Sequence, residues 1–348
     1  MTTLRDLSRH LGLSVTQVSR ALNGHGDVSE ATRQRVEEAA KKLKYIPNIA
    51  ARRLVSGRSG VVGFVERSFE GVARDTILFE TVTGLSSQFS ERGIQFVLHL
   101  TPEDVSADSR SILPVYDRLS LGGSLDGFVL TGPRRNDLRI RHLLNNKIPF
   151  VVHGRSSENP DYPFFDIDNY GLAQRLTRHL IGYGHRRIAL ISGPETFAYT
   201  QFRLAGFKDA LGEAGIAPVP FLIRHAAMTE ATGMIATAQM FADPKRAPTA
   251  IICGNVLIAN GAYRALAALG REVPADVSVV AHDDVVSPAR TDSFYPTLTV
   301  TRSALSASWG PLADFLIGAI EGRAAGEIQE VAQVDFIERA SVAAPRPE

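Results

Sequence analysis

The sequence predicts a small all-α head followed by a larger α/β body. At 348 residues the chain is too long for one ordinary core and suits two or three domains. Residues 1–60 contain eleven Lys and Arg against five Asp and Glu, whereas the remaining chain contains 27 against 32. Apolar residues recur at helical spacing in the first sixty residues, and short apolar runs alternate with amphipathic stretches after Val61. The basic head is therefore the part expected to meet a polyanion, although a solvated charged surface gives the same balance.

The bulk composition is that of a soluble globular protein, with 44% hydrophobic and 22% charged residues. No apolar run approaches the roughly 18 residues needed to span a bilayer. The N-terminus, Met1–Arg5, lacks the pattern of a signal peptide. Cys253 is the single cysteine, which excludes an internal disulfide and a cysteine-based zinc cluster. We expect a cytoplasmic protein with no membrane partner, no metal and no cofactor.

Three short helices are predicted in the head. The first spans Leu4–Leu11, with Thr3 as its N-cap. The second begins at Ser14, which forms a Ser-x-x-Gln capping box with Gln17. The third runs from Ser29 to about Leu43. The apolar positions that recur at helical spacing are Leu4, Leu7, Leu11, Val18, Leu22, Val36, Ala40 and Leu43.

The turn between the first two helices is only Gly12–Ser14, which is typical of a helix-turn-helix whose second helix enters the major groove. Val15, Thr16 and Arg20 would then face outward. Arg20 suits a guanine edge, Thr16 a base hydrogen bond and Val15 a thymine methyl group. An ordinary three-helix bundle with exposed polar residues is the alternative.

A short Ala- and Arg-rich segment, capped by Asn48, follows the head. It is too short to be a stable helix alone in water. A segment that folds only against DNA and a partner helix has this character, and Leu54 would be its apolar wedge in the minor groove. The alternative is a flexible linker in which Leu54 covers nearby apolar surface.

The head resembles that of the lactose, galactose and purine repressor (LacI-type) family of bacterial transcription regulators, in both order and spacing. The segments that carry the resemblance are Leu4-Arg5-Asp6-Leu7, Val18-Ser19-Arg20-Ala21-Leu22-Asn23-Gly24, Val28-Ser29, Thr32-Arg33-Gln34-Arg35-Val36 and Tyr45-Ile46-Pro47-Asn48. The resemblance implies a DNA-binding domain over residues 1–46, a hinge helix within residues 47–60, and a ligand-binding and dimerisation domain over 61–348. Gln17 stands where the family usually has Thr, which leaves the operator sequence open.

The residues expected to contact DNA are Thr3, Ser14, Val15, Thr16, Gln17, Ser19, Arg20, Asn23, Tyr45, Asn48, Ala51 and Leu54.

The body alternates predicted strands and helices, which indicates parallel sheets covered on both faces and a ligand site beyond the carboxyl ends of the strands. The predicted strands are Val61–Val65, Ile94–Leu100, Gly127–Leu130, Phe150–His153, Phe164–Ile167, Arg187–Ser192, Phe221–His225, Ala250–Cys253 and Val277–Ala281. The family resemblance extends over the body. It implies two doubly wound, periplasmic-binding-protein-like lobes that the chain connects three times, with lobe 1 at about 61–164 and 297–322 and lobe 2 at about 165–296 and 323–342.

Several body residues match family ligand positions, and Arg203 with Asp283 would hold adjacent sugar hydroxyls by charge-assisted hydrogen bonds. Asp168 could instead cap the helix that follows it. Phe79 or Trp309 could stack on a sugar ring, although Trp309 better fits a core or dimer contact. The residues expected to bind the ligand are Phe79, His153, Arg155, Asp168, Arg203, Asn255 and Asp283. Val256 departs from the Asp that the family often has there.

Catalysis has no support, because the sequence contains no nucleophile elbow, Walker loop or His-Glu-x-x-His motif. His282-Asp283-Asp284 is a poor metal site, since adjacent strand residues point to opposite faces. No leucine heptad follows the body, so we expect a homodimer rather than a tetramer. The leading hypothesis is a transcriptional repressor that a small carbohydrate releases from a palindromic operator. The alternative is a small-molecule-binding protein or enzyme with an incidental basic head.

Replacing Arg20 with Ala should weaken specific DNA binding by about 1–3 kcal/mol, because a bidentate base contact is lost. Fluorescence anisotropy on duplex DNA at several salt concentrations measures this change. Duplex affinity that depends neither on salt nor on Arg20 would sink the DNA-binding hypothesis.

Overall fold

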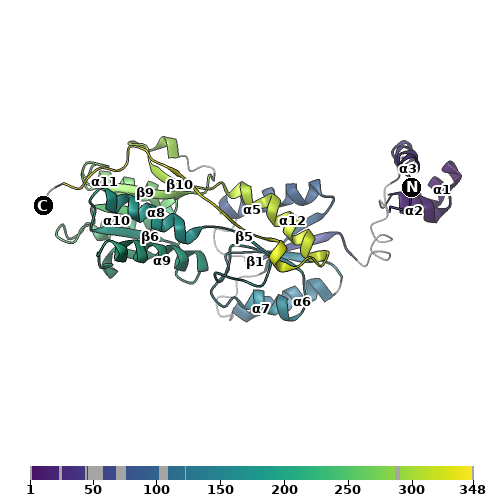
Figure 1. Cartoon of the computed structure of the whole chain (residues 1–348), viewed down its shortest axis with the longest axis horizontal. Coiled ribbons are helices and arrows are strands. Elements are labelled where there is room, and N and C mark those ends of the chain that lie inside the picture. Colours follow the sequence, from purple (N-terminus) through teal and green to yellow (C-terminus); the bar gives the residue numbers. More distant parts are fainter. Residues whose placement is uncertain are drawn as a thin grey trace. The chain divides into compact units, whose positions relative to one another are not determined.

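The computed structural model describes residues 2–22, 26–43, 45, 58–67, 76–101, 109–121, 123–286 and 291–346 (Figure 1). The chain divides into two compact units, residues 1–59 and 60–348, which are described separately. The predicted hinge helix and four predicted DNA contacts, Asn23, Asn48, Ala51 and Leu54, lie outside the described residues.

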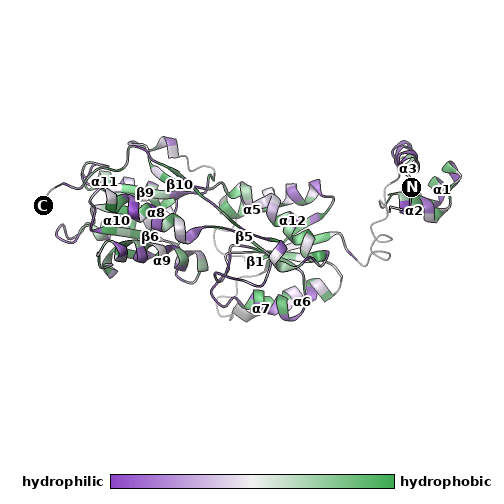
Figure 2. Cartoon of the chain, viewed as in Figure 1, coloured by the Kyte–Doolittle hydropathy of each residue, from purple (hydrophilic) through white to green (hydrophobic). Residues whose placement is uncertain are grey.

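The head contains the three predicted helices, α1 (Leu4–Leu11), α2 (Val15–Leu22) and α3 (Glu30–Lys42). The capping box before α2 is present, because Gln17 N donates to Ser14 Oγ (3.1 Å) and Ser14 N donates to Gln17 Oε1 (3.0 Å). Each helix contributes to one small core made of Leu7, Val18, Ala21, Val36 and Ala39. The outer surface of α3 is largely hydrophilic (Figure 2), as expected of a helix that buries one stripe.

The first lobe of the body is a parallel six-stranded sheet in the order β11-β5-β4-β3-β1-β2. Its strands are β1 (Val61–Arg67), β2 (Gln95–Thr101), β3 (Gly127–Thr131), β4 (Phe150–His153), β5 (Phe164–Ile167) and β11 (Gln329–Ala332). Its helices are α5 (Thr76–Glu91), α6 (Leu113–Leu121), α7 (Leu138–Asn145) and α12 (Trp309–Ile320). One hydrophobic cluster joins α5 and α12 to the sheet, and another joins α6 and α7, so both faces are covered (Figure 1).

The second lobe repeats this plan with the strand order β12-β10-β9-β8-β6-β7. Its strands are β6 (Ile188–Ser192), β7 (Ile223–His225), β8 (Ala250–Cys253), β9 (Ser278–Asp283), β10 (Thr299–Arg302) and β12 (Asp335–Ile337), of which β12 is antiparallel to β10. Helices α8 (Asn169–Gly182) and α9 (Ala198–Glu213) share one hydrophobic cluster with the sheet, and α10 (Glu230–Met240) and α11 (Val256–Ala268) share the other.

The strand order reverses beside the first strand of each lobe, between β1 and β3 and between β6 and β8. Open parallel sheets of this kind hold ligands at such switch points, outside the carboxyl ends of the strands. The predicted doubly wound lobes are therefore confirmed. Among the described residues, no helix is both long enough and apolar enough to cross a membrane.

The lobe boundaries differ from the prediction at all three connections. Strand β5 belongs wholly to the first sheet, so the first connection follows Ile167 and not residue 164. Strand β10 pairs with β9 in the second lobe, although 297–322 was expected in the first. Strand β11 pairs with β5 in the first lobe, although 323–342 was expected in the second. In each case the chain completes a strand before it crosses to the other lobe. The alternation of predicted strands and helices along the sequence does not show to which sheet that strand belongs.

A glycine in α9 sets the approach of α8 and α9. A Cβ atom at Gly206 would meet the carbonyl oxygen of Tyr170 in α8, whereas one at Gly212 in the same helix would meet nothing. Gly206→Ala should therefore lower the free energy of unfolding by about 1–3 kcal/mol. Gly212→Ala, the matched control, should raise it by about 0.5–1 kcal/mol. Urea unfolding of both variants checks this, and an equal effect of the two would contradict the close packing.

Candidate functional site

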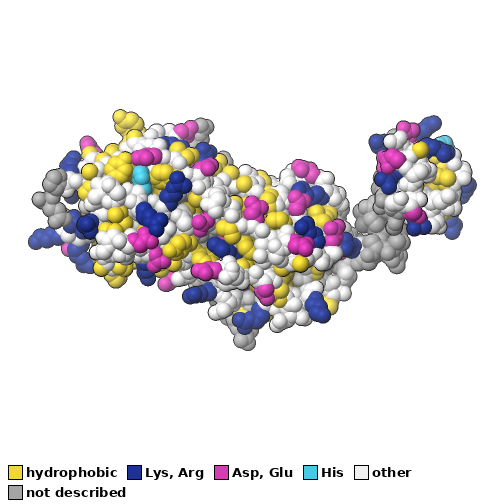
Figure 3. Space-filling model, viewed as in Figure 1, with side chains coloured by type: hydrophobic (Ala, Val, Ile, Leu, Met, Phe, Trp, Pro, Cys, Tyr) yellow, Lys and Arg dark blue, Asp and Glu magenta, His cyan; other side chains and the backbone are white. Residues whose placement is uncertain are grey.

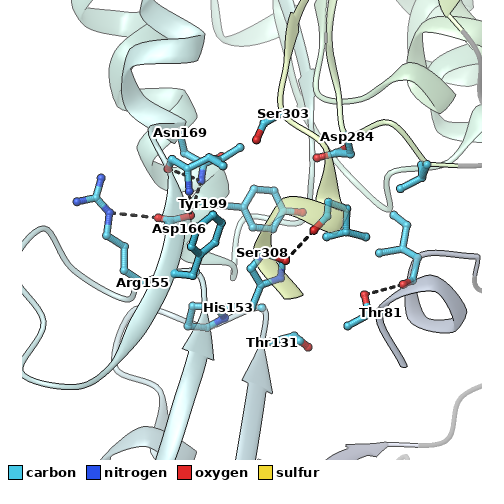
Figure 4. Close-up of a pocket in the computed structure, with 18 of the residues that line it drawn as sticks. Thr81, Thr131, His153, Arg155, Asp166, Asn169, Tyr199, Asp284, Ser303 and Ser308 are labelled. Atoms are coloured by element: carbon cyan, nitrogen blue, oxygen red, sulfur yellow. Dashed lines mark hydrogen bonds and ion pairs between the residues drawn. The ribbon is translucent and has the colours of Figure 1, made fainter. Parts of the chain in front are cut away.

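A cavity of about 420 Å³ lies between the two lobes, at the carboxyl ends of the parallel strands. Figure 4 shows Thr131 and His153 where β3 and β4 end, with Ser303 and Asp284 across the space from them. The polar side chains that line it are Glu66, Thr81, Thr131, His153, Arg155, Asp166, Asn169, Tyr199, Arg203, Asp284, Ser303 and Ser308. Phe64, Phe165 and Met228 are among its apolar lining residues. Apolar walls with a few converging polar groups are typical of small-molecule sites.

Arg203, on α9, is held in place by contacts on three sides. Its Nε donates to Asn169 Oδ1 (2.8 Å), and its Nη1 donates to the carbonyl oxygen of Gly254 (2.7 Å). The guanidinium carbon also lies 5.2 Å from the centre of the Tyr199 ring. The side chain is buried, so these contacts replace the water that a guanidinium otherwise requires.

A second guanidinium, that of the partly buried Arg155, pairs with the buried Asp166 at 3.1 Å. Arg155 follows β4 and Asp166 lies on β5, so neighbouring strands bring the two together. Burial raises the pKa of Asp166 to about 6, against the opposing effect of Arg155. The carboxylate is therefore ionised at neutral pH but easily protonated below it.

Asp284 and His153 both have a lowered pKa, which leaves Asp284 ionised and His153 uncharged at neutral pH. Burial disfavours the ionised form of Asp284, yet interactions with His282 and Arg203 outweigh it and hold its pKa below the ordinary value. Burial lowers the pKa of His153 to about 4, although Asp284 opposes the shift. At neutral pH the cavity thus offers a carboxylate acceptor at Asp284 beside a neutral imidazole.

The structure places three of the seven predicted ligand residues in the cavity lining: His153, Arg155 and Arg203. Phe79 does not line the cavity, because it points outward from α5 with 69% of its surface exposed. Trp309 packs against Gly84 of α5, which agrees with the core role that the sequence favoured.

The other three are structural, and their predicted ligand roles are corrected here. Asp168 caps α8, accepting from Gly171 N (2.8 Å), which is the alternative that the sequence left open. Asn255 caps α11, accepting from Ile258 N (2.9 Å). Asp283 accepts from Val285 N (2.8 Å) and pairs with Arg302 (3.5 Å). None of these three residues is among those that line the cavity.

Sequence reasoning missed several lining residues. Asn169 and Asp284 directly follow predicted residues, and Asp166 lies two positions before one. The alternation of side chains along a strand was a usable signal, since it separates Asp283 from Asp284. The hydroxyl groups of Thr81, Thr131, Ser303 and Ser308 carry no comparable signal. Within the described ranges, no group of three His, Cys, Asp or Glu residues could hold a metal ion.

In the head, α2 presents a polar surface opposite its buried residues Val18 and Ala21. The predicted contacts Ser14, Val15, Thr16, Gln17 and Arg20 are exposed, while Ser19 is partly buried. Arg20 pairs with Asp27 (2.9 Å), and both side chains are about half exposed, so this pair is open to exchange for a nucleic acid partner.

Two other predicted contacts serve the head's own structure. Thr3 caps α1 in a reciprocal box with Asp6, and Tyr45 packs against the head core. Lys and Arg side chains are visible on the exposed face of the head in Figure 3.

The raised pKa of Asp166 makes stability depend on pH. The folded state binds the proton more tightly than the unfolded chain, so this group's contribution is present below pH 3.8 and is lost as the pH rises through about 6. The difference in unfolding free energy between wild type and Asp166→Asn should therefore fall by about 2–2.5 kcal/mol between pH 4 and about pH 7.5.

Urea unfolding at several pH values measures that difference. Asp137→Asn is the control of opposite sign, because Arg139 outweighs burial and lowers the pKa of Asp137. A difference for Asp166→Asn that stays constant with pH would contradict the assignment.

Comparison with known proteins covers both parts of the chain. Residues 3–48 match the profile described as "Bacterial regulatory proteins, lacI family", and residues 177–342 match that of a periplasmic binding protein-like domain. The chain is 40% identical over 347 residues to the HTH-type transcriptional regulator AglR of Rhizobium meliloti, covering 99% of this chain and 95% of that protein. It is 32% identical to the HTH-type transcriptional regulator CelR of Thermobifida fusca, covering 97% and 98%.

Solved structures agree with these matches. The transcriptional regulator CelR–cellobiose complex superposes with a TM-score of 0.68 at 28% identity, covering 98% of this chain and 100% of that one. The lac repressor dimer bound to operator shares the fold, with a TM-score of 0.75 at 24% identity over 99% of both chains. The chain therefore belongs to the LacI family of bacterial transcription regulators, with a helix-turn-helix DNA-binding domain followed by a periplasmic-binding-protein-like domain.

Proposed function

We propose that this regulator is a repressor whose homodimer binds a palindromic operator in the cytoplasm and releases it when a carbohydrate occupies the cavity of the body. The observation that carries the proposal is the cavity itself, at the junction of two lobes in a chain with a DNA-binding head. A ligand that touches both lobes has different contacts in different lobe arrangements, which is what a switch requires.

The lining supports a carbohydrate as the effector. Sugar rings combine adjacent hydroxyl groups with an apolar face. The Asp284 carboxylate and the Arg203 guanidinium suit the hydroxyls, and Tyr199 and Phe165 offer aromatic surface. The relative solved with cellobiose has the same fold over its whole length. On this proposal the cavity binds and does not catalyse.

An apolar surface on the first lobe supports dimerisation. Phe79 on α5 is 69% exposed, and Leu100 on the edge strand β2 is 42% exposed. Helix α5 packs beside β2, so these side chains belong to neighbouring elements. A second copy that covered them would remove apolar surface from water and protect the edge strand. Two heads would then read two half-sites related by the same two-fold axis.

The test begins with duplexes selected from a random library by the full-length protein, which should yield a palindrome. A panel of uncharged monosaccharides and disaccharides, cellobiose included, is then titrated while operator binding is followed by anisotropy. At least one sugar should weaken operator binding by about tenfold or more.

Asp284→Asn should keep operator affinity and lose most of this response, because an ionised acceptor leaves the cavity. Asp335→Asn, an exposed aspartate on β12, is the control and should respond as wild type does. Tighter operator binding with sugar would reverse the proposed sign, and a wild-type protein that no sugar affects would refute carbohydrate control.

A further inference from the structure

Hydrogen bonds join four side chains across the lobe junction. Figure 4 shows three of them, Arg155, Asp166 and Asn169. Arg155 Nε donates to Asp166 Oδ2 (3.1 Å), and Asn169 Nδ2 donates to Asp166 Oδ1 (3.0 Å). Arg203 Nε donates to Asn169 Oδ1 (2.8 Å). Arg155 and Asp166 belong to the first lobe, whereas Asn169 and Arg203 belong to the second.

The donors and acceptors in this series of hydrogen bonds can be arranged in only one way. A guanidinium only donates hydrogen bonds and an ionised carboxylate only accepts them. A side-chain amide donates through its NH₂ group and accepts through its oxygen. Asp166 must therefore receive the NH₂ group of Asn169, which leaves the amide oxygen facing Arg203. Two further contacts agree, because Ile167 N donates to Asp166 Oδ1 (2.9 Å) and Asn169 Nδ2 also lies 3.3 Å from the Ile167 carbonyl oxygen.

We propose that Asp166 is a positioning residue for Arg203: by fixing the orientation of the Asn169 amide, its carboxylate aims the Arg203 guanidinium into the cavity. The inference rests on the proposed function, since it takes Arg203 as a group that meets the effector. With Nε on Asn169 and Nη1 on Gly254, the Nη2 group of Arg203 has no hydrogen-bond acceptor among the described residues. That NH₂ group is the one presented to a bound hydroxyl.

The arrangement makes a contact in one lobe depend on a residue of the other. If the lobes turn so that Asp166 and Asn169 separate, the amide keeps only its longer bond to the Ile167 carbonyl oxygen, and its orientation toward Arg203 Nε is less firmly fixed. An effector bonded to Arg203 therefore favours the lobe arrangement in which all four side chains are joined. This gives the effector a difference in affinity between the two states, which any switch needs.

Asp166→Asn disrupts the series of hydrogen bonds, because it replaces a group that only accepts by one that must also donate. The new amide must turn its NH₂ group toward either Arg155 or Asn169, and each of those already donates. Asp137→Asn is the matched control, because Asp137 and Arg139 form a buried pair (2.8 Å) wholly within the first lobe. Those side chains are 3% and 16% exposed, against 7% and 13% for Asp166 and Arg155.

The double variant Asp166→Asn with Asn169→Asp tests the direction itself. The new carboxylate at position 169 accepts from Arg203 and from the new amide at position 166. The carbonyl of that amide then accepts from Arg155. The guanidinium donors at both ends regain acceptors, while Ile167 N loses the one it has on residue 166. A recovery of sugar affinity in the double variant is therefore not explained by a gain in general stability.

Two measurements are made on the full-length protein. Calorimetry gives the affinity for the panel sugar that most weakens operator binding, and ligand-free crystal structures give the separation of Arg203 Nε from the side chain at position 169. Asp166→Asn should bind the sugar at least about tenfold more weakly, with Arg203 displaced. Asp137→Asn should stay within about twofold of wild type, and the double variant within about threefold.

The proposal fails if Asp166→Asn binds as wild type does with Arg203 in place, or if the double variant is as weak as the single one. If no sugar binds the wild type, the proposed function fails, and the crystal structures still decide whether Asp166 positions Arg203.

Discussion

Parallel strand pairing is the constraint on which the body depends. Because β1 to β5 run the same way, as do β6 to β10, these strands end at the same edge of their sheet in each lobe, and only β12 among the described strands runs the other way. The three connections between the lobes all leave from that edge, after β5, β10 and β11. Many of the groups that line the cavity, from Thr131 on β3 to Asp284 after β9, are gathered by this rule, and the helices α5 and α9 add others such as Thr81 and Arg203. Neither lobe could hold the site without the other.

The cavity carries polar groups that weaken the fold in which they sit. Asp166 is buried beside Arg155, yet its raised pKa shows that the attraction does not repay the loss of water. Arg203 uses two of its donors on protein acceptors before any ligand arrives. Burying apolar side chains at the same positions would cost less free energy. The presence of these polar groups is therefore consistent with a site that binds a polar ligand.

Much of this architecture could be read from the sequence because helix and strand periodicities are local. The head helices, the caps at Thr3 and Ser14, the start of the third helix near Ser29, and the strands β1 to β9 follow from that local pattern. The residues of the site were harder to predict from the sequence, because the role of each residue depends on where its side chain points. Asp168 and Asp283 stand beside the lining residues Asn169 and Asp284, but each points into a turn. The partners of β10 and β11 are set by long-range pairing that no short window of sequence contains.

The late return of the chain to the first lobe bears on how the protein is made. Leu312, Ala313 and Leu316 of α12 pack against Val62 and Val129, residues synthesised 183 to 254 positions earlier. Until α12 emerges from the ribosome, α5 alone covers this face of the first sheet, and the edge of the sheet lacks β11. The second lobe is nearly continuous in sequence and needs only β12 to finish. Ribosome-bound chains should therefore carry a folded head and a nearly complete second lobe while the first lobe still lacks α12 and β11.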